Sequence, residues 1–337
     1  MILIFTNKED AHPNPVFDLL TERGVPFFRF NTEDLLTDYS VNWWADNDQS
    51  DFELVNRKTG LSVKGSDITA VWDRRPEIPE NLPFQNTPEI NRHNLKEGRA
   101  FLQFLRHYIK HIPSIGSIVE DRVASSKMLQ YRVAKECGFL IPDTVFSNDK
   151  VEIIKMAKRH ERICLKPIES SNIWDEKNGV DYVFYTQSIQ SEELDTIPEE
   201  AFLQTVSFVQ EYVPKDFELR VTVVDETVFA TRIHSQNLPE DKGKVDWRQG
   251  YDEGLNFEEY QLPDSICKQC STLVHAMGLN FGCIDLIAKP DGELVFLECN
   301  PNGQWLWIEL ATGQKIAEAI ADFFTSLEHG RRERCTL

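Results

Sequence analysis

An Asp291-Gly292 pair lies between two apolar runs in the C-terminal part of the chain, and this feature constrains the fold more than any other. An Asp-Gly pair in such a setting predicts a β-hairpin with a two-residue turn. In that turn Pro290 would pair with Glu293, although a proline cannot donate the hydrogen bond nearest the turn. The pairing fixes the register of the whole hairpin, and therefore the face of the sheet on which each side chain lies.

This register sets two acidic residues opposite each other. Counting back five positions from the turn places Asp285 opposite Glu298, and such residues share a face with Cβ atoms about 4.5–5.5 Å apart. Asn300 lies two residues further along and points the same way. Two bare carboxylates would repel there, whereas three oxygen ligands on a rigid platform suit Mg²⁺. We therefore predict a magnesium site; the alternative is a solvated hairpin face with two aligned acids.

Composition excludes several classes of function. The chain has 337 residues, enough for two or three packed domains, and its net charge of −19 argues against a nucleic-acid-binding surface. The seven scattered cysteines do not form a disulfide framework. No apolar run approaches the roughly 18 residues of a membrane span, and the N-terminal run lacks the basic start of a signal peptide. We expect a cytoplasmic protein that binds neither nucleic acid nor membrane.

The spacing of apolar residues divides the chain into three parts. Residues 1–115 alternate apolar runs with helical patterns, which predicts a small parallel α/β domain without a dinucleotide fingerprint. Residues 116–205 mix helices and strands. Residues 206–330 favour antiparallel strands, followed by an amphipathic helix at Gln314–Leu327. The fold class is therefore α/β at the N-terminal end and α+β beyond it.

Two lysines are candidates for phosphate binding. Lys127 begins a predicted helix at Ser125–Gly138, and Lys166 interrupts the apolar strand Arg162–Ile168 just before a proline. A charge in such a strand either extends to an edge or meets an anion. The loop Glu169–Ile173 could add hydroxyl and N–H groups for phosphate. The alternative for each lysine is a solvated surface charge.

Three arginines lie in and around one predicted hairpin of this acidic protein: Arg220, Arg232 and Arg248. Guanidinium groups suit bidentate recognition of carboxylate or phosphate, so we predict an anion-holding wall, with surface ion pairing as the alternative. The segment Trp72–Pro76 ends a predicted strand with two adjacent arginines. We favour interdomain packing for that pair over ligand binding.

A strand at Phe208–Val213 leaves its sheet at a proline. Its exposed backbone groups could contact a flat purine edge, and Glu218 could accept hydrogen bonds from ribose hydroxyls. An ordinary strand and turn is the alternative.

Taken in order, these motifs resemble the ATP-grasp fold over roughly residues 115–325. The matching series is Ser126-Lys127, Leu165-Lys166-Pro167, Gln210-Glu211-Tyr212-Val213, Glu218-Leu219-Arg220, Asp285 and Glu298-Cys299-Asn300-Pro301. Within that superfamily, Val71–Pro76 and Asn300–Trp305 resemble the ribosomal-peptide maturases that make microviridin-type graspetides. Those ligases close ester or amide rings between side chains of a precursor peptide.

The resemblance implies ATP and Mg²⁺ as cofactors, a pre-ATP-grasp domain at the N-terminal end, a precursor peptide as partner, and a homodimer. It also implies a role for each candidate: Lys127 and Lys166 at the ATP phosphates, Gln210, Glu211 and Val213 at the adenine, Glu218 at the ribose, Asp285, Glu298 and Asn300 at Mg²⁺, and Arg220, Arg232 and Arg248 at the transferred phosphate and the acceptor carboxylate.

The expected reaction is activation of Asp or Glu side chains as acyl phosphates, followed by attack of a hydroxyl or amine of the same peptide. Three alternatives share part of this site. An intermolecular amino-acid or peptide ligase, of the type that glutamylates ribosomal protein, differs only in the acceptor. A phosphotransferase would stop at the phosphorylated product. A nucleotide-binding regulatory module would show no turnover.

Overall fold

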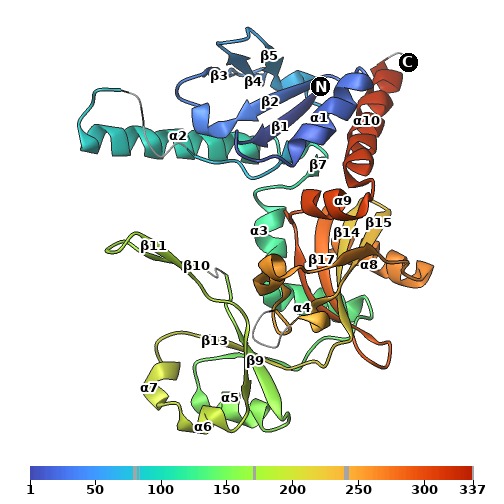
Figure 1. Ribbon diagram of the computed structural model, residues 1–337. Helices are drawn as coiled ribbons and strands as arrows, with labels where there is room; N and C mark the ends of the chain where they lie inside the picture. Colours follow the sequence, from blue (N-terminus) through green and yellow to red (C-terminus); the bar gives the residue numbers. More distant parts are fainter. Residues whose placement is uncertain (79–81, 83, 170–171, 239–242, 336–337) are drawn as a thin grey trace.

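The computed structural model describes residues 1–78, 82, 84–169, 172–238 and 243–335. Its elements form three sheet-based regions in chain order, and the C-terminal helix returns to the first of them (Figure 1). This arrangement confirms the mixed α/β and α+β class.

The N-terminal region is built on a parallel sheet with strand order β2-β1-β6-β7. Its elements are β1 (Ile2–Thr6), α1 (Pro13–Glu22), β2 (Phe27–Asn31), β6 (Ala70–Asp73), α2 (Pro88–Tyr108) and β7 (Ser114–Ile115). Side chains of β1 alternate between the two faces, because Ile2 and Ile4 pack in one apolar cluster and Leu3 and Phe5 in another. A smaller antiparallel sheet, which the sequence did not reveal, comprises β3 (Tyr39–Ala45), β4 (Ser50–Asn56) and β5 (Ser62–Lys64).

The central region contains an antiparallel sheet with order β12-β9-β13-β8. Its elements are β8 (Thr144–Ser147), α5 (Lys150–Ala157), β9 (Arg162–Lys166), β12 (Gln187–Gln190), α6 (Glu193–Thr196), α7 (Glu199–Phe202) and β13 (Ser207–Glu211). A separate ribbon of β10 (Asn172–Asp175) and β11 (Val180–Val183) extends away from this sheet (Figure 1). The boundary at residues 205 and 206 stays a prediction; β13, just beyond it, pairs with β8 and β9.

The C-terminal region is an antiparallel sheet with order β16-β15-β14-β17-β18. Its strands are β14 (Phe217–Val224), β15 (Thr227–Ile233), β16 (Phe257–Glu259), β17 (Phe281–Ala288) and β18 (Leu294–Asn300). One face packs against α4 (Lys127–Glu136) and α8 (Asp264–Ala276). The opposite face carries α9 (Leu306–Thr312) near one end and leaves the other end open to the candidate site.

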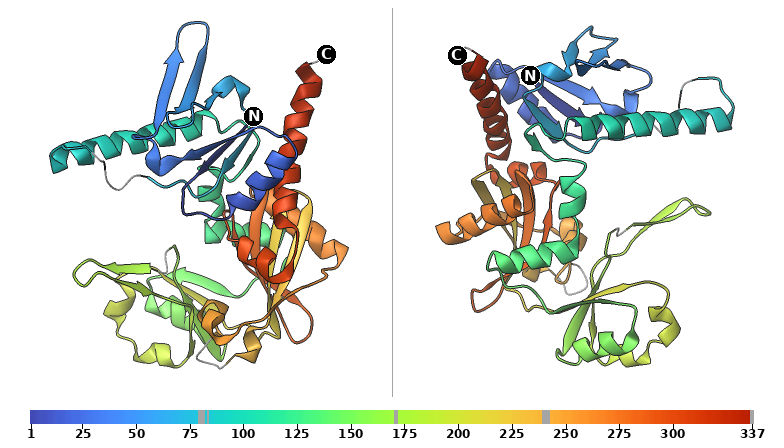
Figure 2. Two further views of the ribbon diagram at one scale, coloured as in Figure 1. Left: turned by 45° about the horizontal axis from the view of Figure 1, so that its top comes forward. Right: turned by 180° about the vertical axis from the view of Figure 1, so that it is seen from behind.

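The closing helix α10 (Ile316–Cys335) begins two residues after the predicted start and extends beyond the predicted end. Its predicted apolar face is confirmed, since Ile316, Ile320 and Phe324 are fully buried. These side chains pack with α1 and Trp72, so α10 joins the C-terminal sheet to the N-terminal region (Figure 2). Within the described ranges, no helix has the length and apolar character needed to cross a membrane.

Asp285 pairs with Glu298 in the acidic hairpin as predicted, but the turn and the strands between differ from the prediction. The turn is one residue longer than expected, because Lys289 N–H donates to the carbonyl oxygen of Glu293 at 2.9 Å, and Gly292 adopts a left-handed φ of +89°. The prediction of a two-residue turn was therefore wrong. A β-bulge between Leu286 and Asp285 takes up the extra residue at Leu297, so Asp285 still pairs with Glu298.

Candidate active site

A cavity of about 790 Å³ lies between the central and C-terminal sheets. Strands β9 and β13 form one wall, the hairpin β17–β18 and strand β14 form another, and Arg75 of the N-terminal region reaches one end. Eleven of the twelve predicted site residues line it: Lys127, Lys166, Gln210, Glu211, Val213, Glu218, Arg220, Arg248, Asp285, Glu298 and Asn300.

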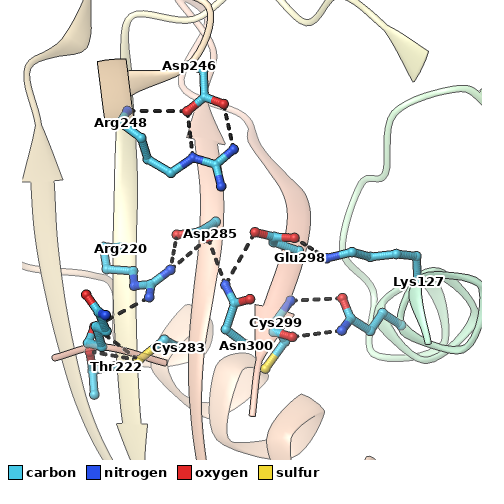
Figure 3. Close-up of polar contacts among 12 residues, drawn as sticks. Lys127, Arg220, Thr222, Asp246, Arg248, Cys283, Asp285, Glu298, Cys299 and Asn300 are labelled. Atoms are coloured by element: carbon cyan, nitrogen blue, oxygen red, sulfur yellow. Dashed lines mark hydrogen bonds and ion pairs between the residues drawn. The ribbon is translucent and has the colours of Figure 1, made fainter. Parts of the chain in front are cut away.

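The hairpin brings the predicted magnesium ligands together (Figure 3). The side-chain amide nitrogen of Asn300 lies 3.2 Å from Oδ2 of Asp285 and 3.3 Å from Oε1 of Glu298. The bulge lets both Leu297 and Glu298 border the cavity instead of alternating between the faces. Rotating the Asn300 amide by half a turn would present its oxygen beside the two carboxylates. The set then offers oxygen ligands alone, which fits Mg²⁺.

Cations hold both carboxylates in place (Figure 3). Nη1 of Arg220 lies 2.8 Å from each carboxylate oxygen of Asp285, and the ammonium of Lys127 forms an ion pair with Glu298. These contacts arise because Arg220 faces Asp285 across β14 and β17, while Lys127 begins the helix that packs beside β18. Positive charge thus offsets the repulsion that two adjacent carboxylates would otherwise suffer.

The same charges set the acidity of the pair. Burial raises the pKa of Asp285 to about 6, although Arg220 opposes the increase. Burial also favours the neutral form of Glu298, but Lys127, Lys166 and Arg248 outweigh it and hold the pKa of Glu298 well below its usual range. Glu298 is therefore an anion at neutral pH and is suited to a metal cation.

Lys166 is the last residue of β9. Its Nζ is 5.9 Å from the centre of the Phe208 ring, and burial lowers the pKa of Lys166. A desolvated ammonium of this kind favours an anionic ligand such as phosphate.

The end of the cavity lined by Gln210 and Val213 combines one apolar wall with polar groups. Val213, Ile287 and Leu297 belong to a small apolar cluster that borders the cavity. The amide nitrogen of Gln210 donates to Tyr131 Oη at 2.7 Å and to Thr144 Oγ1 at 3.0 Å, whereas its buried Oε1 has no hydrogen-bond partner among the described residues. An unpartnered buried acceptor beside an apolar wall suits a planar ligand that carries N–H groups.

Glu211 and Glu218 also line the cavity. Glu211 lies 3.3 Å from Nδ1 of His160. The buried carboxylate of Glu218 pairs with Lys215 and accepts a hydrogen bond from Ser235 Oγ at 3.0 Å.

Arg232 is not brought into the cavity. In the β14–β15 register Arg220 pairs with Thr231 and Leu219 pairs with Arg232, so the two arginines lie on opposite faces of the sheet. The Arg232 guanidinium instead lies 4.0 Å from the centre of the Phe217 ring, and its nitrogens are 3.6 Å from Glu258 and 3.9 Å from Asp216. The predicted wall therefore consists of Arg220 and Arg248 at this cavity.

Arg248 binds Asp246, a cavity residue that the sequence analysis did not predict. Its Nε and Nη2 lie 2.8 and 2.5 Å from the carboxylate oxygens of buried Asp246, which also accepts from the Thr186 N–H at 3.2 Å. The only sign of this ion pair in the sequence is that Asp246 and Arg248 lie two residues apart.

The adjacent arginines of Trp72–Pro76 have separate roles. Arg74 is 1% exposed and binds Asp10 at 2.9 Å and the backbone and side-chain oxygens of Asn302 at 2.9 and 2.7 Å. The preferred interpretation, interdomain packing, is therefore confirmed for Arg74. Arg75 has a left-handed φ of +48° and lines the cavity.

Asp121 also lines the cavity, although no sequence motif pointed to it. Ser170 and Ser171 of the proposed phosphate loop lie outside the described residues.

Comparisons with known proteins agree with this geometry. A tetrahydromethanopterin:alpha-L-glutamate ligase of Methanocaldococcus jannaschii is 26% identical over 227 residues, which span 66% of this chain and 72% of that protein. The crystal structure of the macrocyclase MdnC of Microcystis aeruginosa MRC, bound with precursor peptide MdnA, aligns with a TM-score of 0.80 and 28% identity over 96% of this chain and 99% of that chain.

A RiPP-associated ATP-grasp ligase of Chryseobacterium gregarium, in complex with ADP and a leader and core peptide, aligns with a TM-score of 0.85 and 25% identity over 96% of each chain. Residues 1–122 match the MvdD pre-ATP grasp domain, and residues 121–324, more than half of the chain, match the RimK-like ATP-grasp domain. The protein therefore belongs to the RimK-like ATP-grasp family and is an ATP-grasp ligase with a pre-ATP-grasp domain at its N-terminal end.

Proposed function

We propose that this ligase activates Asp or Glu side chains of a ribosomal precursor peptide as acyl phosphates and closes intramolecular ester or amide rings. One observation carries the proposal: a single cavity holds the acidic hairpin, both lysines, and arginines from the C-terminal region and the N-terminal region. The macrocyclase and the RiPP-associated ligase, which share this architecture over almost the whole chain, are described with precursor, leader or core peptides.

In this proposal ATP occupies the end of the cavity lined by Gln210, Glu211 and Val213, with Glu218 at its ribose. Lys127 and Lys166 contact its phosphates. Asp285, Glu298 and Asn300 hold Mg²⁺, which neutralises negative charge on the phosphates when bound. The ion pairs of the hairpin support this arrangement, since Glu298 already attracts the cation of Lys127 and Asp285 that of Arg220, as carboxylates that bind Mg²⁺ would.

In this proposal the protein contributes positive charges beside the reacting groups and holds those groups in position. A peptide carboxylate must approach the anionic γ-phosphate, and Arg220 and Arg248 offset that repulsion from one side of the cavity. The carboxylate oxygen attacks phosphorus and ADP leaves. A hydroxyl or amine of the same peptide then attacks the acyl carbon and phosphate leaves. Arg232 has no role in this proposal because its side chain lies on the other face of the sheet.

The proposal is tested with ATP, Mg²⁺ and the small peptide encoded beside this gene, with products read by mass spectrometry. Ring closure removes one water per bond and forms one ADP and one phosphate. A product heavier by one phosphate without phosphate release would indicate a phosphotransferase. No ADP with any peptide would indicate a nucleotide-binding module without turnover.

A second function is favoured by the likeness to the glutamate ligase, which joins separate molecules. The ATP end of the site would be unchanged, and only the acceptor would differ. A product that gains the mass of an added amino acid, instead of losing water, would favour this intermolecular reaction. The homodimer and the three domain boundaries also remain proposals, and light scattering would measure the first.

A further inference from the structure

Asp121 is an acidic residue of the cavity to which the proposed function assigns no role. It lies in α3 (Glu120–Ala124), the short helix before the one that begins with Lys127. It lines the cavity together with Arg75 and Asn302, which follows the hairpin residue Asn300 by two positions. The residues proposed for the adenine and ribose come from β13, β14 and the segment between them, so Asp121 belongs to a different wall.

The two oxygens of Asp121 have different surroundings. Oδ2 accepts a hydrogen bond from the side-chain amide of Asn302 at 3.4 Å. Asn302 is itself fixed, because the same amide donates to the backbone oxygen of Asp73 at 2.9 Å and its Oδ1 accepts from Arg74 at 2.7 Å. Oδ1 is buried and has no hydrogen-bond partner among the described residues. A buried carboxylate oxygen without a partner, on a residue that lines the cavity, favours a donor that a bound ligand brings against this wall.

Asp121 differs from the carboxylates of the hairpin in having no cationic partner among the described residues. Asp285 is bound by Arg220, and Glu298 by Lys127, whereas the described residues place no cation within ion-pair distance of Asp121. The charged groups that face it are Asp73, on β6, and Arg106, on α2, and Arg106 is itself bound to Asp73 at 2.6 and 2.8 Å.

Burial, reinforced by the negative charge of Asp73, raises the pKa of Asp121 to about 7 and outweighs the backbone N–H of Ser117, the amide of Asn302 and the charge of Arg106, which all lower it. A carboxylate with its pKa near neutrality can take up and release a proton at working pH.

We propose that Asp121 binds the attacking hydroxyl or amine of the acceptor side chain and takes its proton. The inference rests on the proposed ligase function. As the oxygen or nitrogen bonds to the acyl carbon, the carbon–oxygen bond to phosphate breaks and the electron pair leaves with phosphate. The proton passes to the carboxylate of Asp121 and reaches solvent when the product leaves the cavity. Asn302 holds Oδ2, so the free oxygen keeps a fixed direction.

The test separates the two half-reactions in Asp121→Asn. Hydroxylamine at high concentration traps an activated carboxyl as a hydroxamate and needs no base from the protein. The probe is the peptide encoded beside this gene, with ATP and Mg²⁺. We expect ring closure to fall about 10²- to 10⁴-fold, the usual contribution of a general base, while hydroxamate formation stays within about threefold of wild type. The matched control is Glu120→Gln on the same short helix, which should leave both reactions unchanged.

A pH series adds a readout that a purely structural role would not change. The wild-type rate of ring closure should rise as the pH increases through about 7, because the carboxylate is the active form, and the variant should lose this limb. Ring closure by Asp121→Asn at the wild-type rate would overturn the inference. So would equal loss of ring closure and hydroxamate, because Asp121 would then act on activation or on folding. Wild-type enzyme that forms no ring and no hydroxamate would refute the proposed function instead.

Discussion

Replacing Arg74 by methionine should destabilise the junction between the N-terminal region and the acidic hairpin. Arg74 is buried, and its guanidinium binds Asp10 on one side and the oxygens of Asn302 and Gly303, at 2.7–3.1 Å, on the other. Methionine has a similar length but no hydrogen-bond donor. The substitution therefore leaves the Asp10 carboxylate buried without its cation and frees the loop that follows the proposed metal ligands.

The expected magnitude follows from these contacts. Removing one partner of a buried ion pair costs about 3–5 kcal/mol of unfolding free energy. Burial would raise the pKa of Asp10, but the hydrogen bond from His12 and the charge of Arg74 hold it at about 2, compared with 3.8 for a free side chain. That difference alone corresponds to roughly 2 kcal/mol, part of which belongs to Arg74.

The sign of the pH dependence follows from that lowered pKa. A group with a depressed pKa in the folded state stabilises the fold fully above its unfolded value, near 4, and loses the contribution as the pH falls towards 2. The difference in stability between wild type and Arg74→Met should therefore be largest above pH 4. It should shrink in acid, where Asp10 is neutral and needs no cation.

Equilibrium urea unfolding measures this change through tryptophan fluorescence. Trp72 and Trp305 are both 1% exposed and pack in the apolar cluster that joins α1, β6 and α10, so they report on the region around Arg74. The control is Arg75→Met, which removes the neighbouring, exposed arginine and should change stability by less than about 0.5 kcal/mol. A loss below about 1 kcal/mol for Arg74→Met, or a difference that grows in acid, would refute the reasoning.

Three further predictions test other parts of the structure. Glu298→Gln should abolish ATP-dependent product and the thermal stabilisation by Mg²⁺ and ADP while leaving the circular dichroism unchanged; retained turnover would contradict the metal assignment. Arg220→Ala should lower kcat about 10²- to 10³-fold, whereas Arg232→Ala, on the opposite face, should stay within about twofold; equal losses would contradict the placement of Arg232. Gly292→Ala should cost about 1–2 kcal/mol in thermal unfolding because its φ of +89° disfavours a side chain; an unchanged Tm would contradict the observed turn.

The sequence by itself determined the elements whose signals are local. Short apolar runs identified buried strands such as Ile2–Thr6. Glycine at a helix end identified the helix that begins at Lys127, and Gly138 there has a left-handed φ of +85°. The Asp-Gly pair located the hairpin, and the period of two along a strand placed Glu298 and Asn300 on one face. These features depend on neighbours within a few residues, which the sequence displays directly.

The hairpin register shows where local reasoning ends. The turn is one residue longer than the Asp-Gly pair indicated. The bulge leaves one residue, Leu297, unpaired, and this restores the predicted register beyond it. The sequence does not distinguish Leu297 from the other apolar residues of its strand. The pairing of Asp285 with Glu298 was thus confirmed although one step of the argument for it was wrong.

Only the tertiary structure decided which charged residues share the cavity. Arg220 and Arg232 carry the same charge and lie on adjacent strands, yet the pairing of β14 with β15 puts them on opposite faces. Asp121 and Arg75 reach the site because α3 and the end of β6 meet the loop after β18. The physical reason is that a side chain's surroundings depend on strands and helices distant in sequence, and packing alone brings those together.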